Sequence, residues 1–135
     1  MVELTDYARA LGIEADRIDH GAPILRVEFS EAVQGRPGAL HGGAISGLLE
    51  TAGYALLRDA LKEAGRTGQL KPINLTVQFL AAGKPRTSYA KARIVKLGRR
   101  TANLSIEAWQ DDPDRPIASA VMNVMIAEAS GNPGT

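Results

Sequence analysis

One carboxylate stands out in this sequence, because Glu50 is the only acidic residue between Ala39 and Leu57. Apolar residues around it recur at three- and four-residue spacing, which is typical of a helix, so we expect Glu50 to lie mid-helix among apolar neighbours. A buried carboxylate is costly unless it is paired or its pKa shifts. Two interpretations follow: Glu50 is a reactive acid, or it reaches a solvent edge or a buried partner for structural reasons.

The residues one turn away from Glu50 favour a reactive acid. Ser46, Gly47, Gly53 and Tyr54 are mostly small, and they leave space beside the carboxylate for a ligand or another backbone. Ser46 has no histidine at a helix-compatible offset and no Gly-x-Ser-x-Gly frame, so we do not expect a serine hydrolase.

The sequence His41-Gly42-Gly43 begins the same helix, with Gly42 eight residues before Glu50. No Ser, Thr, Asp or Asn is at the cap, so we expect the N–H groups of the first turn to lack a side-chain acceptor. Such groups suit an anion or an oxyanion, and glycine lets a substrate approach the backbone. The alternative is a glycine-rich helix start that binds only water, with His41 as a cap or a structural histidine.

The elements that must position these residues can be read from hydrophobic spacing and from Gly and Pro. We expect a short helix at 3–13, a strand at 24–29, a long helix at 44–64 closed by Gly65 and Gly68, and strands at 73–79, 87–97, 102–108 and 117–126. Short links between the last four strands predict antiparallel hairpins. The predicted class is α+β, a helix packed on an antiparallel sheet.

Composition limits the kind of protein. A chain of 135 residues is one domain, which we place at 1–135 with its core at about 22–128 and a frayed tail at 130–135. With no cysteine and two histidines we expect neither a disulfide nor a structural zinc site, and no metal or cofactor. The net charge of +1 argues against nucleic-acid binding. We expect no signal peptide or membrane span, and a cytoplasmic protein.

The positive charge is concentrated in residues 84–100, which hold seven basic residues and no acid. They are Lys84, Arg86, Lys91, Arg93, Lys96, Arg99 and Arg100. Such a stretch is either a solvated strand face or a site that attracts phosphates.

Three segments together resemble a known family: His41-Gly42-Gly43, Glu50-Thr51-Ala52, and Ile73 to Leu80 with the sequence INLTVQFL. They are similar to the hotdog-fold acyl-CoA thioesterases, in the branch with phenylacetate-pathway and Glu-type 4-hydroxybenzoyl-CoA thioesterases. The resemblance covers residues 25–126, and the acid at this offset from His-Gly-Gly is its specific part. It implies one long central helix wrapped by a five- to six-stranded antiparallel sheet.

The resemblance also implies an activity, the hydrolysis of an acyl-CoA to CoA and a carboxylic acid. Glu50 would be the nucleophile or the general base, and the Gly42 backbone N–H would polarise the thioester carbonyl from the other subunit. Thr51 matches a water-holding hydroxyl, and His41 joins the catalytic group. We expect a homodimer with joined sheets, and a tetramer made of two such dimers.

Further site residues are expected around this centre. The family often has Asn or Gln six residues before the histidine; that position is Gly35 here, and a one-residue shift of the loop would bring Gln34 there. Gly43 and Tyr54 are expected to contact the substrate, whose CoA is not a separate cofactor. Arg99 and Arg100, in a turn between strands, are expected to hold the CoA phosphates.

Two other functions stay open at this stage. One is a hydratase or dehydratase acting on acyl thioesters, which would need a histidine paired with an acid in a different arrangement, and His20 is poorly placed for it. The other is a non-catalytic acyl-CoA-binding module. The sequence does not name the acyl group, separate the two roles of Glu50, or choose between tetramer arrangements.

Overall fold

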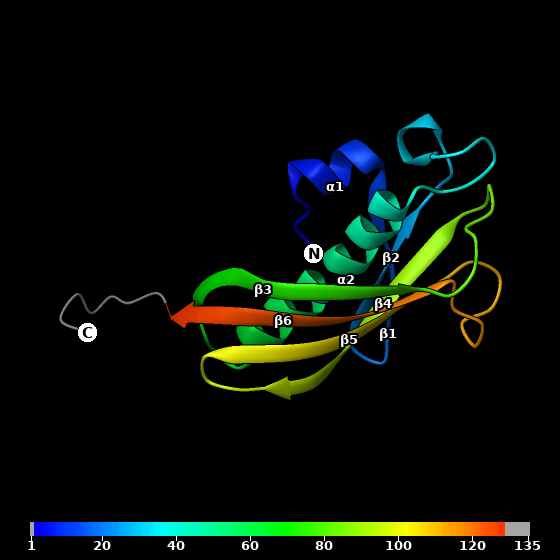
Figure 1. Cartoon of the computed structure of the whole chain (residues 1–135). Helices are drawn as coiled ribbons and strands as arrows, with labels where there is room; N and C mark the ends of the chain where they lie inside the picture. The colour runs from blue at the N-terminus through cyan, green and yellow to red at the C-terminus, as the bar shows by residue number, and fades with distance from the viewer. Residues whose placement is uncertain (1, 129–135) are drawn as a thin grey trace.

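The computed structural model describes residues 2–128 and contains one long helix packed on a six-stranded antiparallel sheet (Figure 1). The strand order is β1-β2-β4-β5-β6-β3. The elements are α1 (Asp6–Leu11), β1 (Ile13–Asp19), β2 (Ala22–Val27), a 3₁₀ turn η1 (Glu31–Val33), α2 (Gly42–Glu63), β3 (Gly68–Phe79), β4 (Ser88–Leu97), β5 (Thr101–Trp109) and β6 (Ala118–Glu128). This architecture confirms the predicted α+β class and the hotdog fold. The expected frayed tail lies outside the described residues.

Helix α2 forms where its spacing predicts it, starting two residues earlier and ending one residue earlier than expected. Its end is fixed by Gly65, whose φ of 67° is in the left-handed region that favours glycine. The Arg66 N–H donates to the Leu61 carbonyl at 2.9 Å and the Gly65 N–H to the Lys62 carbonyl at 3.0 Å. These two bonds satisfy carbonyls that the last helical turn leaves open.

The helix crosses the middle of the sheet at close range. A Cβ on Gly53 would lie 2.4 Å from Cε of Met122 on β6, so any larger residue at this contact requires the Met122 side chain to shift. Leu48, Leu49 and Leu57 are fully buried against the sheet together with Leu104 and Ile106 of β5. This packing fixes the rotation of α2, and therefore the direction in which its polar side chains leave the sheet.

The N-terminal part of the fold differs from the prediction. The expected helix at 3–13 ends at Leu11, because Gly12 takes a φ of 82° and its N–H donates back to the Ala8 and Arg9 carbonyls. Strand β1 follows and was not predicted. It is an edge strand in which only Ile13 is fully buried, so no apolar alternation marks it. Two left-handed residues, His20 and Gly21, turn it into β2.

The predicted hairpin between the strands now called β3 and β4 is wrong. β3 pairs with β6, and β4 lies between β2 and β5. The link at 80–87 contains Gly83 and Pro85 and is long enough to carry the chain across the sheet instead of reversing it in place. The other two predicted hairpins, β4 to β5 and β5 to β6, are confirmed.

Strand β3 is an edge of the sheet, and it begins five residues before the predicted start. A bulge at Ile73 interrupts its pairing with β6 and breaks the expected alternation. Ile73 and Phe79 are 49% and 55% exposed, although the pattern places both among the apolar positions of the strand. A 12-residue edge with exposed apolar side chains is an open template for another strand.

Candidate active site

Glu50 lies in the middle of α2 and is half-buried, so it is less enclosed in a single chain than its apolar neighbours suggest. Its carboxylate forms no hydrogen bond or ion pair with residues 2–128. A half-buried carboxylate without a protein partner is free to contact water or a ligand.

The start of α2 has a side-chain cap, so the expectation of an empty cap was wrong and the alternative, with His41 as the cap, is confirmed. Nδ1 of His41 accepts a hydrogen bond from the Ala44 N–H at 2.8 Å. Nε2 of the same ring lies 3.3 Å from the Ala32 carbonyl and donates to it, since Nδ1 is the acceptor. Both nitrogens of His41 are therefore occupied, and the ring holds the helix start and the preceding loop together.

Two N–H groups remain open at this helix start. Those of Gly42 and Gly43 have no acceptor within the described chain. Gly42 borders a cavity of about 540 Å³ lined by residues of the loop before α2, the start of α2 and the end of β3 with the link that follows it. Phe79 lies over Gly42, and a Cβ on Gly42 would be 3.2 Å from its ring. The site combines N–H donors with a helix N-terminus and can therefore hold an oxyanion.

Thr51 and Gln34 are engaged within their own elements. The Thr51 hydroxyl donates to the Gly47 carbonyl at 2.7 Å, so only its lone pairs remain to accept from water. Oε1 of Gln34 accepts from the Gly38 N–H at 3.0 Å and closes the loop before α2. Gly35 packs directly on His41, because a Cβ there would be 2.8 Å from the His41 Cβ. In this loop conformation Gln34 keeps only its amide N–H groups for a further contact.

Tyr54 lies one turn after Glu50 on the same side of α2. Burial raises the pKa of the Tyr54 hydroxyl above its ordinary value of 10.0, and the nearby Glu50 carboxylate raises this pKa further. Arg58, another turn on, opposes this shift, and its guanidinium lies 5.4 Å from the centroid of the Tyr54 ring. Glu50, Tyr54 and Arg58 thus form a stripe along one face of the helix.

Arg99 and Arg100 are not near the start of α2. They are exposed in the β4–β5 turn, whose carbonyls at Gly98 and Arg99 accept hydrogen bonds from Arg66, just after the end of α2. The helix rises about 1.5 Å per residue, so this end is about 20 Å along the axis from Glu50. Within one chain the structure does not bring these arginines to the Gly42 donors.

Tyr7 of α1 lies beside the helix start and was missed by the sequence prediction. Its hydroxyl is 3.4 Å from the Gly43 carbonyl, and a Cβ on Gly47 would be 3.0 Å from its ring. The space that small residues leave near Glu50 is therefore partly filled by α1 at Gly47, and by Met122 at Gly53. The glycine at position 47 was the only signal, and it does not say which segment packs there.

Glu50 and Gly42 of one chain are too far apart to act on the same carbonyl group. Eight residues of helix correspond to about 12 Å along the axis, whereas an oxyanion donor and an attacking acid must each come within about 3 Å of the reacting group. The two groups can therefore serve one reaction only if they come from different chains.

Among residues 2–128, no group of three or more His, Cys, Asp or Glu side chains could hold a metal ion. No helix in the same range is long and apolar enough to cross a membrane.

Solved structures share this fold over most of the chain. A protein from Chromobacterium violaceum is 30% identical, with 90% of this chain and 82% of that chain covered and a TM-score of 0.71. A thioesterase from Staphylococcus aureus is 20% identical, with 91% and 99% covered and a TM-score of 0.79. A phenylacetic acid degradation-related protein from Ralstonia eutropha is 21% identical, with 92% of each chain covered and a TM-score of 0.78.

Sequence comparison points in the same direction. A protein of Saccharolobus solfataricus described as an esterase is 29% identical over 101 residues, which are 73% of this chain and 63% of that protein. The chain thus spans less than two thirds of the length of this curated relative. The family model of the thioesterase superfamily matches residues 37–117, a range that holds the loop before α2, all of α2, and β3 to β5. The chain belongs to the thioesterase superfamily.

Proposed function

We propose that the protein is an acyl-CoA thioesterase, which hydrolyses the thioester to CoA and a carboxylic acid. The observation that carries this proposal is the unpartnered Glu50 carboxylate on the helix whose first N–H groups, at Gly42 and Gly43, are also open. Membership of the thioesterase superfamily supports it.

Each group has a chemical task in this proposal. The Gly42 N–H donates to the thioester carbonyl oxygen and stabilises the negative charge that develops there during attack. Glu50 takes a proton from the attacking water, or attacks the carbonyl carbon itself and is then released by water. The C–S bond breaks, the CoA thiolate leaves and takes up a proton, and the acyl group leaves as a carboxylic acid.

The 12 Å between Glu50 and Gly42 along one helix leads us to a homodimer with composite sites. The open edge of β3 is the surface for it, because the exposed strand can pair with a second copy. In an antiparallel pair, the start of β3 in one chain lies beside the end of β3 in the other. Gly42 lies beside the end of β3 in its own chain. In the dimer, the Gly42 N–H of the partner would therefore lie near the start of β3 in this chain and would face the adjacent side of α2.

The alternatives fit the chain less well. A hydratase needs a histidine that can exchange a proton with substrate, but both ring nitrogens of His41 are hydrogen-bonded, and His20, in the β1–β2 turn, lines neither the cavity at Gly42 nor the one at Arg58. A non-catalytic binding module has no need for a free carboxylate beside an electrophilic carbonyl. His41 instead holds Gly42 and Gly43 in place as the helix cap.

The test is an assay of thiol release from a panel of acyl-CoAs, with the wild type and Glu50→Gln. We expect hydrolysis by the wild type and a loss of about 10²–10⁴-fold in kcat in the variant, since a positioned base or nucleophile is removed. Glu63→Gln is the matched control: it removes an exposed carboxylate from the last turn of the same helix and should leave kcat unchanged.

Two results would contradict the proposal in different ways. A wild-type protein that releases no thiol from any acyl-CoA is not this kind of enzyme. A Glu50→Gln protein that keeps more than about a third of wild-type kcat shows that Glu50 is neither base nor nucleophile.

A further inference from the structure

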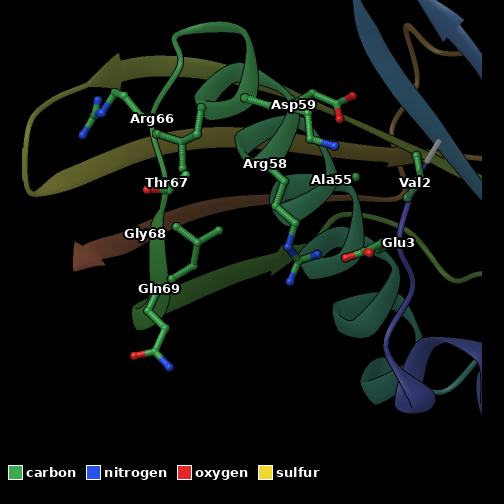
Figure 2. A pocket seen from close by; sticks show the side chains of 12 residues that line it. Val2, Glu3, Ala55, Arg58, Asp59, Arg66, Thr67, Gly68 and Gln69 are labelled. Atoms are coloured by element: carbon green, nitrogen blue, oxygen red, sulfur yellow. The ribbon is translucent and has the colours of Figure 1, made fainter. Parts of the chain in front are cut away.

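A large cavity lies between the second half of α2, the start of β3 and the N-terminal segment (Figure 2). Its volume is about 870 Å³. Apolar side chains from Val2, Ala55, Leu61 and Leu70 line part of it, and charged or polar side chains from Glu3, Arg58, Asp59, Lys62, Arg66, Thr67 and Gln69 line the rest. The cavity is distinct from the one at Gly42, which lies at the other end of α2 and β3.

Two of its three basic side chains are free to bind a ligand. Arg66 donates to the Gly98 and Arg99 carbonyls and so is anchored to the β4–β5 turn. Arg58 and Lys62 form no ion pair with any other residue of the 2–128 range. Figure 2 shows the Arg58 side chain extending into the space between the start of β3 and the N-terminal segment at Glu3.

Arg58 is also held in a defined position. Its guanidinium lies 5.4 Å from the centre of the Tyr54 ring, and stacking of this kind leaves the N–H donors at its edge available. Glu3 and Asp59 line the same cavity, so its overall field is only weakly positive. Recognition of an anion must therefore come from direct contacts with Arg58 and Lys62 instead of long-range attraction.

This cavity continues the stripe that begins at Glu50. Arg58 lies two turns beyond Glu50 and Lys62 three turns beyond, which is about 12 Å and 18 Å along the helix axis. The pantetheine arm of CoA, which separates the thioester from the pyrophosphate, is of comparable length. A thioester attacked by Glu50 can therefore place its far, charged end in this cavity.

We propose that the cavity beside Arg58 and Lys62 is the subsite for an anionic part of the thioester substrate. The inference rests on the proposed thioesterase function and extends it by naming the residues that hold the substrate away from the reacting bond. Two sources could supply the anion: a phosphate of CoA, or a carboxylate at the far end of the acyl group. Both would accept charge-assisted hydrogen bonds from the guanidinium and the ammonium group.

The experiment compares three thioesters whose acyl chains have the same length. They are the CoA thioester of a neutral acyl chain, the pantetheine thioester of the same chain, which has no phosphate, and a pantetheine thioester whose acyl chain ends in a carboxylate. KM and kcat are measured for the wild type, for the double variant Arg58→Gln/Lys62→Gln, and for Arg58→Lys, which keeps the charge. Arg93→Gln is the matched control, because Arg93 is exposed on β4 between Ala92 and Ile94, which face α2.

We expect the double variant to raise KM by about tenfold or more for the substrate that carries the anion, with kcat little changed. A rise for the CoA thioester alone identifies a CoA phosphate, and a rise for the carboxylated pantetheine thioester identifies the acyl carboxylate. Arg58→Lys should retain part of the affinity, and Arg93→Gln should match the wild type. Circular dichroism checks that the variants fold, as expected for changes at exposed Arg58 and Lys62.

An unchanged KM for all three substrates, in a wild-type enzyme that hydrolyses them, overturns the subsite and leaves the proposed function intact. Absence of hydrolysis by the wild type refutes the proposed function and, with it, the proposed subsite. The two failures are therefore distinguished by the wild-type measurement alone.

Discussion

Complementation between two inactive variants tests whether the site is shared between chains. Glu50→Gln removes the acid. Gly42→Val places a branched side chain beside the N–H donor and blocks the approach of a carbonyl group. The Val side chain meets Phe79, since even a Cβ at this position would lie 3.2 Å from the ring. Phe79 is 55% exposed and has room to move, so we expect the variant to fold.

The expected magnitude follows from the position of the two groups. If Glu50 of one chain works with Gly42 of the other, every site in either homodimer carries one lesion and is inactive. A mixed dimer has one site with both lesions and one site with neither. Its activity should therefore be about half that of the wild-type dimer, while each homodimer loses about 10²-fold or more.

The assay requires differently tagged chains, co-expressed and purified through both tags, followed by thiol release from an acyl-CoA. A mixture of separately purified homodimers, assayed before exchange, serves as the control for residual activity. If mixed dimers form but restore no activity, the acid and the donor belong to the same chain. That result would refute the argument from the 12 Å helical separation.

Two further predictions concern α2. The Tyr54 hydroxyl should ionise above pH 10.0, because burial and the Glu50 carboxylate both raise its pKa. In a spectrophotometric titration of tyrosinate, Glu50→Gln should lower the pKa of Tyr54 and Arg58→Gln should raise it. The opposite order would refute the assignment of causes. Gly53→Ala should lower the free energy of unfolding by about 1–3 kcal/mol in chemical denaturation, because the new Cβ would lie 2.4 Å from Met122. Ala55→Gly is the control, which changes helix propensity without a clash. An unchanged free energy of unfolding in Gly53→Ala would show that Met122 can move aside.

The sequence predicted the parts of the fold in which one face is buried continuously. Helix α2 and strand β5 bury a regular set of apolar residues, so their periodicity gave bounds within two residues of those observed. β1 escaped prediction because it is an edge strand that buries little, and no spacing rule marks it. The pairing of β3 with β6 joins strands that are far apart in the sequence, and the length of the link after β3 does not predict it.

For the candidate site, sequence reasoning found positions but not partners. It placed Glu50 mid-helix and His41 at the helix start, since both follow from local spacing. It expected an uncapped helix start and gave a His41 cap only as the alternative, because helix caps are usually short side chains that carry an oxygen. Tyr7 was missed because its contact with α2 depends on how α1 packs at Gly47, and Arg58 because the cavity that it lines is formed only when β3 lies beside α2.

Several polar groups that have no partner within residues 2–128 lie along the space between α2 and β3. Gly42, whose N–H group has no acceptor, lines the cavity at the end of β3, and Arg58 and Lys62 line the cavity at its start. The backbone groups on the outer edge of β3 face no other strand of the described sheet. Polar groups of this kind need water or another molecule as partner. Antiparallel pairing of β3 with a second copy would bring the start of one β3 strand to the end of the other. This one interface would pair the open edge of β3, and it would also bring Gly42 of one chain to the cavity at Arg58 and Lys62 of the other.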